Sequence, residues 1–332
     1  MLHHVRPACS GPFRPNCHLE VTPEFLRQAV ERIRANGYHI IALDEAIDLL
    51  KSGYGKPERY AVLTFDDGYR DNLEIAYPVL KALSAPFTVY VASGLVDRTS
   101  ELWWLALERI IARNDEVTFL QNGTASGVPC RSVDEKNACF DHLAHYLTHD
   151  VSEQDQRAII RSLAEQYGLD LKKLADEQMM SWDEVRQLAS DPLVTIGAHT
   201  HNHMALARLR ADAARADVLK GMERLETELG RRPKHFAYPY GKSNAAGPRD
   251  AAILREIGFA SSVTTQPGVL HSSNARDTMM LPRVSLNGCF QDPSVVDQYL
   301  TGAPFALYGI ARWAAMRFGV RTGVSRFSPS TR

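Results

Sequence analysis

Short runs of apolar residues alternate with amphipathic segments along most of the chain. Short apolar runs bounded by turn residues are typical of buried strands, whereas a three-to-four-residue apolar repeat is typical of helices. Strands that alternate with helices usually form a parallel sheet or barrel, so the sequence predicts an α/β fold. The predicted strands are residues 2–5, 38–43, 60–65, 87–92, 193–197, 235–239, 259–264 and 281–286.

The predicted helices between these strands carry recognisable end signals. Thr22 followed by Pro23 is typical of an N-cap and a first helical residue, and Gly37 is expected to end that helix. Between residues 209 and 229, apolar residues recur every three or four positions and predict one buried helical stripe. Gly230 is expected to end this second helix.

The alternation breaks between about residues 97 and 192, where helical stretches follow one another with little strand pattern. Ser181 and Glu184 form a capping-box pattern that starts the last of these helices. Long insertions in α/β folds usually lie on one rim. We interpret the segment as a helical insertion, a lid or a flanking subdomain, within one domain of residues 1–300; a separate domain is the alternative.

The C-terminal segment, residues 301–332, differs from the rest. It is predicted to form one apolar helix from Phe305 to Phe318, followed by a tail rich in Gly, Ser and Arg. Such a tail is expected to be mobile.

The composition is that of a soluble globular protein. Of 332 residues, 45% are hydrophobic and 23% charged, and the net charge of -1 gives no reason to expect nucleic acid or an anionic membrane as a partner. No stretch has the apolar length of a membrane span, and the N-terminus lacks the apolar region of a secretory signal. The five cysteines show no metal or disulfide spacing and are expected to be reduced thiols: Cys9, Cys17, Cys130, Cys139 and Cys289.

These observations predict a cytoplasmic protein. The prediction depends on Met1 being the true start, because residues 2–5 resemble the second half of a strand.

Two adjacent acids, Asp66 and Asp67, follow a predicted strand in the stretch VLTFDDGY. Neighbouring side chains on a continuing strand point to opposite faces. Gly68 would let the chain turn directly after the acids, so that both lie at the rim while pointing in different directions. Taken alone, however, the pair could be an ordinary turn.

Three histidines alternate after another predicted strand, at His199, His201 and His203. If the strand continued, all three would share one face. If a helix or helical turn began near Thr200, only His199 and His203 would share a face. The residues that follow, Met204 to Leu209, favour the helix, and His201 is then expected to have no role in chemistry.

Two imidazoles and one carboxylate are enough to hold a catalytic zinc ion with one position open for water. Residues beyond the carboxyl ends of parallel strands converge on one rim, so the acids and the histidines are expected to meet. One carboxylate could then bind the metal while its neighbour acts as general base towards water, whose pKa the metal brings towards ~7. A carbonyl group would be attacked, with its oxyanion held by the metal and a backbone N–H.

The motifs resemble those of the polysaccharide deacetylases, the NodB-homology group of carbohydrate esterase family four. The run from Thr64 to Gly68 is similar to their first signature, and His199-Thr200-x-x-His203 to their second. With Tyr238-Pro239-Tyr240-Gly241 and Leu281-Pro282-Arg283, the resemblance extends to about residue 290. The form FAYPYG is most similar to that of the poly-N-acetylglucosamine and chitooligosaccharide deacetylases.

The resemblance implies a distorted (β/α) barrel of about seven to eight strands that removes N-acetyl groups from sugars with a metal-activated water. It implies Asp66 as the base and Zn²⁺, or Co²⁺, Ni²⁺ or Mn²⁺, as the cofactor. The Tyr240 N–H would help to hold the oxyanion, and Thr200 would brace the histidine loop. The implied metal ligands are Asp67, His199 and His203, and the expected supporting residues include Tyr238, Pro239 and Arg283.

Two features depart from the family pattern. Ala237 stands where the third signature often has an arginine, so the usual partner of the catalytic aspartate is missing there. The late Leu-x-His that supplies the general acid is also not evident. His271 lies in a polar stretch, and His3 or His4 on the first strand could instead reach the mouth of the barrel.

Three further residues have two possible roles. Trp103 and Trp104 could form a platform that stacks on sugar rings, but their segment is apolar on nearly every side, which favours packing in a core. Arg283 follows a proline at the start of a predicted strand and could serve either the surface or the site.

The sequence therefore predicts a metal-dependent N-deacetylase acting on an N-acetylated oligosaccharide, polysaccharide or glycolipid. Two alternatives remain open at this stage. One is a carbohydrate-binding protein of the same fold without turnover, and the other is a non-haem iron oxygenase, which also uses two histidines and one carboxylate.

Overall fold

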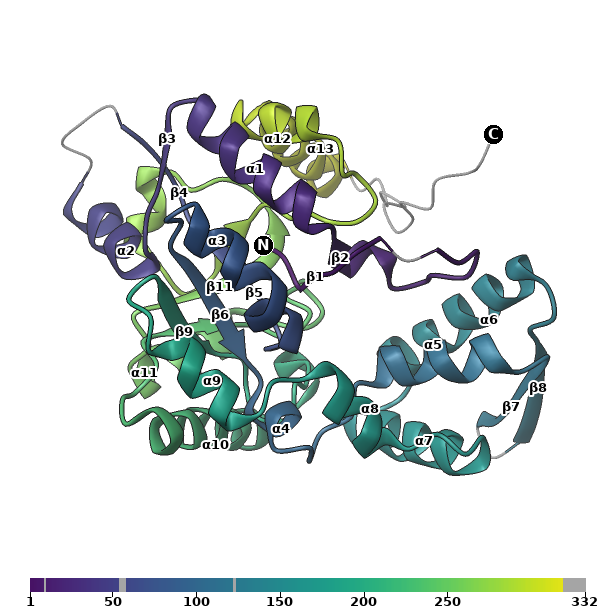
Figure 1. Cartoon of the computed structure of the whole chain (residues 1–332). Helices are drawn as coiled ribbons and strands as arrows, with labels where there is room; N and C mark the ends of the chain where they lie inside the picture. Colours follow the sequence, from purple (N-terminus) through teal and green to yellow (C-terminus); the bar gives the residue numbers. More distant parts are fainter. Residues whose placement is uncertain (9, 54–57, 122–123, 319–332) are drawn as a thin grey trace.

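The computed structural model describes residues 1–8, 10–53, 58–121 and 124–318. Its central element is a curled sheet of six parallel strands, in the order β12-β11-β10-β9-β6-β5. The sheet covers half of a barrel and is packed between helices (Figure 1). The strands are β5 (Leu63–Phe65), β6 (Phe87–Val91), β9 (Val194–Ala198), β10 (His235–Ala237), β11 (Ser261–Pro267) and β12 (Leu281–Arg283).

The N-terminal segment joins the two edges of this sheet. Leu2 bridges Phe65 beside β5, where it donates to the Thr64 carbonyl oxygen at 2.8 Å and accepts from the Asp66 N–H at 3.0 Å. On its other side, the nitrogen of Met1 donates to the Val284 carbonyl oxygen at 2.8 Å, just after β12. The first residues therefore occupy the place of a seventh strand, as a barrel requires.

Three small sheets accompany the main one. β1 (His4–Val5) pairs in parallel with β2 (Glu20–Val21), and β3 (Tyr38–Ile40) pairs in parallel with β4 (Arg59–Ala61). The predicted strand at 60–65 is thus two strands, since Val62 separates β4 from β5. β7 (Glu116–Gln121) and β8 (Thr124–Pro129) form an antiparallel pair that the sequence pattern did not predict.

The helices around the barrel begin and end largely where their end signals place them. Thr22 accepts a hydrogen bond from the Phe25 N–H, and Gly37 has a φ of 77° just after the first helix. Both sides of the Ser181 and Glu184 capping box are formed. The barrel helices are α1 (Pro23–Ala35), α2 (Leu43–Ser52), α3 (Tyr77–Ala82), α4 (Ser93–Val96), α9 (Trp182–Ala189), α10 (Ala211–Leu229), α11 (Pro248–Ile257) and α12 (Pro293–Leu300).

Residues 97–181 form the inserted segment, which projects to one side of the barrel (Figure 1). Its apolar side chains form their own buried cluster, into which Tyr69 of the barrel also packs. α9, which follows it, instead buries Val185 and Leu188 in the core of the barrel. The helices of the inserted segment are α5 (Trp103–Arg113), α6 (Val133–His145), α7 (Glu153–Gln166) and α8 (Leu171–Gln178).

At the C-terminal end, α13 (Ala303–Phe318) packs on α12, where the rings of Phe305 and Tyr299 lie 5.4 Å apart. The predicted tail beyond it, residues 319–332, lies outside the described residues, as does Cys9. The other four cysteines are free thiols. No helix in the described part of the chain is long and apolar enough to cross a membrane.

Candidate metal centre and catalytic site

Asp67, His199 and His203 meet at the carboxyl ends of β5 and β9. Oδ1 of Asp67 lies 3.2 Å from Nε2 of His199 and 3.1 Å from Nε2 of His203, and all three side chains are buried. In a tetrahedral zinc site with bonds of about 2.1 Å, ligand atoms are about 3.4 Å apart. Two of the ligand-atom distances are therefore close to those of a metal site, and all three atoms lie within 4.8 Å of one another.

The turn after β5 separates the two acids, because Asp67 has a φ of 77° and Gly68 a φ of 90°. A positive φ is strained for a residue other than glycine and persists only where the surroundings impose it. Asp67 consequently points to the histidines, while Asp66 points to the other side of the site. The sequence prediction that both acids share one rim but diverge is confirmed.

The histidine pair is held by a turn and not by a helix, so the prediction of a helix near Thr200 is wrong. Thr200 and His203 have φ values of 61° and 54°, and the Thr200 hydroxyl accepts a hydrogen bond from the His203 N–H at 2.9 Å. The first helical turn comes only at Leu206. His201 points away from the metal group and bonds the hydroxyl of Ser93 at 2.8 Å.

Two contacts fix this histidine turn from outside. Asp217 accepts from the Asn202 N–H, and its own carbonyl oxygen accepts from the His201 N–H. Gly221 lies so close that a Cβ there would be 2.5 Å from the carbonyl carbon of Thr200. Both residues belong to α10, which therefore presses the turn against the rim.

The orientation of His199 suits metal binding. The Nδ1 atom of His199 lies 2.7 Å from the carbonyl oxygen of Ala237, so this contact fixes which way the ring faces. A carbonyl can only accept, so Nδ1 carries a proton, and Nε2 is the nitrogen that faces Asp67 and is placed to bind a metal. Burial lowers the pKa of His203, which favours its neutral, metal-binding form. Burial raises the pKa of Asp67, but the two imidazoles outweigh it and hold that pKa well below its usual value.

Asp66 is bound by Arg283, which settles the open question about that arginine. The guanidinium donates two hydrogen bonds to the carboxylate, at 2.7 and 2.6 Å, and a third to the Thr264 carbonyl oxygen at 2.8 Å. Burial raises the pKa of Asp66, but the charge and hydrogen bonds of Arg283 lower it overall. The carboxylate is therefore ionised at neutral pH.

The expectation that Asp66 lacks its usual arginine partner is therefore wrong, because Arg283 takes that place. Position 237, where the family pattern often places that arginine, is an alanine in this chain. An arginine at the end of a different strand, β12, instead reaches across to the same carboxylate. In the sequence, the triplet Leu281-Pro282-Arg283 indicated that Arg283 could belong to the site, but it did not indicate that Asp66 is its partner.

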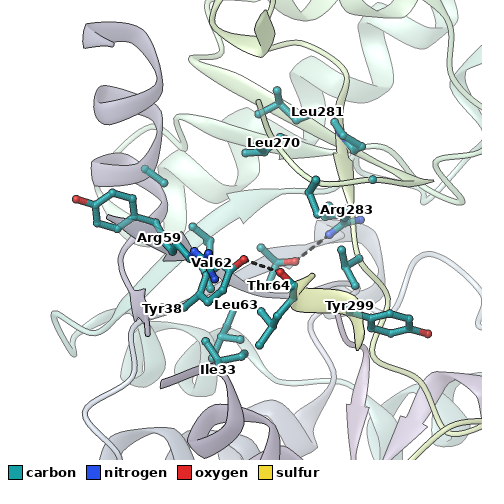
Figure 2. Close-up of a pocket in the computed structure, with 18 of the residues that line it drawn as sticks. Ile33, Tyr38, Arg59, Val62, Leu63, Thr64, Leu270, Leu281, Arg283 and Tyr299 are labelled. Carbon is teal, nitrogen blue, oxygen red and sulfur yellow. Dashed lines mark hydrogen bonds between the residues drawn. The ribbon is translucent and has the colours of Figure 1, made fainter. Parts of the chain in front are cut away.

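A cavity of about 650 Å³ is lined by Arg283, the partner of Asp66 (Figure 2). Thr64 and Arg283 line it, and the two side chains are hydrogen-bonded at 3.2 Å. Most of the remaining lining is apolar and comes from the α2, β4 and α12 regions and from the segment between β11 and β12. Because Asp67, His199 and His203 do not line this cavity, we separate it from the candidate metal centre.

His3 and His4 take different directions from the first strand. Since Leu2 is paired with Phe65, His3 stands beside Asp66, and paired residues of parallel strands share a face. Burial lowers the pKa of His3 to about 4, although Asp67 and Asp66 oppose the shift. His4 instead bonds Asp71 at 2.7 Å and does not join the metal group.

The two tyrosines of the FAYPYG stretch, Tyr238 and Tyr240, lie in different surroundings. The hydroxyl of Tyr238 donates to the Met279 carbonyl oxygen at 2.9 Å, within the core. Pro239 accepts from the Gly241 N–H at 2.7 Å, which forces Tyr240 to a φ of 60°. The Tyr240 ring lies 5.0 Å from the ring of His203. Tyr240 is therefore at the site, whereas Tyr238 is a core residue.

Three residues of the inserted segment contact the site; the sequence favoured core packing over a sugar platform for the two tryptophans and did not single out Arg157. Trp103 donates to the hydroxyl of Tyr240 at 2.9 Å, and Trp104 donates to the hydroxyl of Tyr69 at 3.1 Å. Both indoles are buried, as core packing predicted. Arg157, also buried, donates to the His203 carbonyl oxygen at 3.2 Å. No local motif marks these residues, because their partners are remote in sequence.

Together, the parallel half-barrel and the buried Asp/His/His group beside an ionised aspartate define a (β/α)-barrel protein with a candidate metal site at the carboxyl ends of its strands. The sequence matches the polysaccharide deacetylase family over residues 53–121 and 146–259. The chain belongs to this family.

Individual relatives agree with this assignment. The poly-β-1,6-N-acetyl-D-glucosamine N-deacetylase of Escherichia coli K12 is 22% identical over 271 residues, which are 80% of this chain and 33% of that protein. The chain thus spans about a third of the length of this relative.

Solved structures share the fold. The Streptococcus pyogenes deacetylase PplD, in complex with acetate, superposes with a TM-score of 0.59 at 17% identity, covering 90% of this chain and 95% of that chain. IcaB from Ammonifex degensii gives a TM-score of 0.55 at 20% identity, covering 91% and 96% respectively. These likenesses confirm the barrel predicted from the sequence.

Proposed function

We propose that this protein is a metal-dependent hydrolase that removes N-acetyl groups from an N-acetylated glycan or glycolipid. The observation that carries the proposal is the pairing of two unlike aspartates. Asp67 lies between two imidazoles, while its neighbour Asp66 is ionised and held by Arg283. A metal-binding carboxylate next to a second carboxylate that does not bind the metal and can act as base suits hydrolysis of an amide by metal-activated water.

We assign Zn²⁺, or a similar divalent ion, to Asp67, His199 and His203. One carboxylate oxygen and two imidazole nitrogens suit Zn²⁺, Co²⁺ and Ni²⁺, and the three atoms lie within 4.8 Å of one another. When bound, such an ion would polarise the acetyl carbonyl and acidify a water molecule. The fixed tautomer of His199 and the neutral state of His203 would keep both nitrogens ready to bind it.

Asp66 is the proposed general base. Its carboxylate is ionised at neutral pH and can take the proton from the attacking water. Arg283 keeps both carboxylate oxygens in place, so the base is oriented before substrate binds. The backbone N–H of Tyr240, held by the strained turn after Pro239, would donate to the developing oxyanion.

His3 is the proposed proton donor to the leaving nitrogen. It stands beside Asp66 on the neighbouring strand, whereas His4 is bound to Asp71 and His271 lies on the exposed surface. The lowered pKa of His3 means that it is neutral at rest. In this role the proton that Asp66 takes from the attacking water would pass to His3 as negative charge develops, and His3 would give it to the leaving amine.

The test is acetate release from a panel of acetylated chitooligosaccharides, poly-N-acetylglucosamine fragments and acetylated glycolipids, with metal content measured in parallel. We expect release by the wild type with Zn²⁺ added, in the absence of oxygen, and a fall of about 10²–10⁴-fold for Asp66→Asn with metal retained. No release from any substrate would overturn the proposal and favour a binding protein. Oxygen consumption with Fe²⁺ would favour the oxygenase.

A further inference from the structure

α13 differs from every other part of the described chain in its surface. Three of its large apolar side chains are exposed: Leu307 to 67%, Tyr308 to 40% and Ile310 to 63%. The sequence of Ala303–Phe318 is mostly apolar and contains only two charged residues, both arginines. A helix this apolar is normally buried in a protein core or in a membrane.

The charge of this segment is as distinctive as its hydrophobicity. Residues 303–332 contain five arginines and no lysine, aspartate or glutamate. This segment therefore carries a formal charge of +5, which leaves -6 on residues 1–302, since the whole chain has -1. The net charge of the whole chain therefore conceals a strongly basic C-terminal segment, which gives this part an electrostatic reason to bind an anionic surface.

Within the described residues α13 is shorter than a membrane span, and its composition suits the interface of a bilayer. Sixteen residues extend about 24 Å, less than the ~30 Å of a hydrocarbon core. Helices that lie in the interface carry Trp, Phe or Leu on the face that enters the lipid and Lys or Arg on the opposite face. The sequence of α13 has this composition, with Phe305, Trp313 and Phe318 beside Arg312 and Arg317.

The place of α13 in the fold leaves it accessible. It packs on α12 through Phe305 and stands on the edge of the molecule beside α1 and α12 (Figure 1). The loop after β11 lies against the residue that precedes the helix, since Val269 touches the Cβ position of Gly302. Leu270, next in that loop, is itself 39% exposed, so another apolar side chain lies close to the start of α13.

We propose that α13 binds an anionic lipid surface in the plane of the interface and anchors the barrel there. The apolar side chains would enter the boundary between headgroups and acyl chains, and the arginines would pair with lipid phosphates. This proposal goes beyond deacetylation. It would place the site next to a membrane, where a lipid-linked glycan would be concentrated.

The experiment is co-sedimentation of the full chain with vesicles of phosphatidylcholine alone or mixed with phosphatidylglycerol. We expect binding to the mixed vesicles that weakens as salt is raised, and little binding to phosphatidylcholine. The double substitution Leu307→Glu with Ile310→Glu should weaken binding at least tenfold. Leu120→Glu is the matched control, because Leu120 is also 63% exposed but lies on β7, and it should bind as the wild type does.

Two further measurements keep the result unambiguous. Circular dichroism must show the wild-type fold for each variant, and light scattering must report the mass in solution. Absence of wild-type binding to the mixed vesicles, or equal binding by the double variant, would overturn the proposal. A dimer that the double variant disperses, without vesicle binding, would assign this face to a second copy instead. None of these readouts depends on acetate release.

Discussion

The barrel rim and the inserted segment contribute to the same site in different ways. The rim supplies every side chain with a proposed chemical role: His3, Asp66, Asp67, His199, His203 and Arg283. The inserted segment supplies hydrogen-bond donors that hold those groups or their neighbours, through Trp103, Trp104 and Arg157. In this division, the barrel rim provides the groups that would react or bind metal, and the inserted segment provides hydrogen bonds that fix the positions of those groups.

The largest effect should follow a change at the rim that removes a metal ligand. Asp67→Asn takes away the anionic ligand between His199 and His203, and we expect activity to fall by more than ~10³-fold with loss of bound metal. Metal content by mass spectrometry and acetate release would measure this. Asp66→Asn is the contrast, because it should lose activity but keep the metal. Equal metal content in both variants would contradict the division between the two acids.

A smaller effect is expected from Arg283→Met, which leaves Asp66 buried without its partner. Breaking a buried ion pair costs about 3–5 kcal/mol of unfolding free energy. Burial alone raises the pKa of Asp66, so the acid limb of the activity profile should move to higher pH. In the wild type the lowered pKa keeps the base ionised, and this advantage is lost only as pH falls through that pKa.

Urea unfolding and the pH dependence of kcat/KM would measure both parts of this prediction. Arg283→Lys is the matched variant, since it keeps the charge but not the two parallel hydrogen bonds. We expect its acid limb to lie between those of the wild type and Arg283→Met. An unchanged acid limb in the methionine variant would show that Arg283 does not set the ionisation of Asp66.

The rim residues also show how much of the candidate site could be predicted from the sequence. The acids and histidines lie in short motifs directly after apolar strands, so local pattern was enough to bring them together. The partner of Asp66 is 217 residues away in sequence, and an arginine after a proline carries no signal of that contact. The helix near Thr200 was wrongly predicted because contacts from α10, through Asp217 and Gly221, force a turn that local propensity does not favour.

The inserted segment should give milder effects, beginning with Arg157→Met. The change leaves the Asn202 and His203 carbonyl oxygens without their buried donor, at a cost of about 1–3 kcal/mol. We expect metal affinity to fall by about 10–100-fold, as for other changes behind a metal ligand. Titration with Zn²⁺ would measure the affinity.

Arg161→Met is the control for Arg157→Met on the same helix. Its side chain is 60% exposed and pairs with Glu101, so its loss should cost less than ~1 kcal/mol and leave metal affinity unchanged. If the two variants bound metal equally well, the inserted segment would not hold the histidine turn, and the proposed division of roles would fail.

The smallest effect should come from Trp103→Phe, which removes the indole donor to the Tyr240 hydroxyl and keeps an aromatic ring in the core. One lost hydrogen bond is worth about 1 kcal/mol, or about a fivefold change in rate. We expect kcat to fall by about this factor with metal content unchanged, because Tyr240 is proposed to act on the oxyanion and not on the metal.

Trp182→Phe is the matched control for this last change. Its indole donates at 2.7 Å to Asp97, and its ring packs on Arg224, so the same kind of bond is lost without contact to Tyr240. Its kcat should equal that of the wild type. A loss of metal in Trp103→Phe, or an equal fall of kcat in both variants, would mean that Trp103 only packs the core. A selective fall of kcat would show that the inserted segment reaches the oxyanion side of the site through Tyr240.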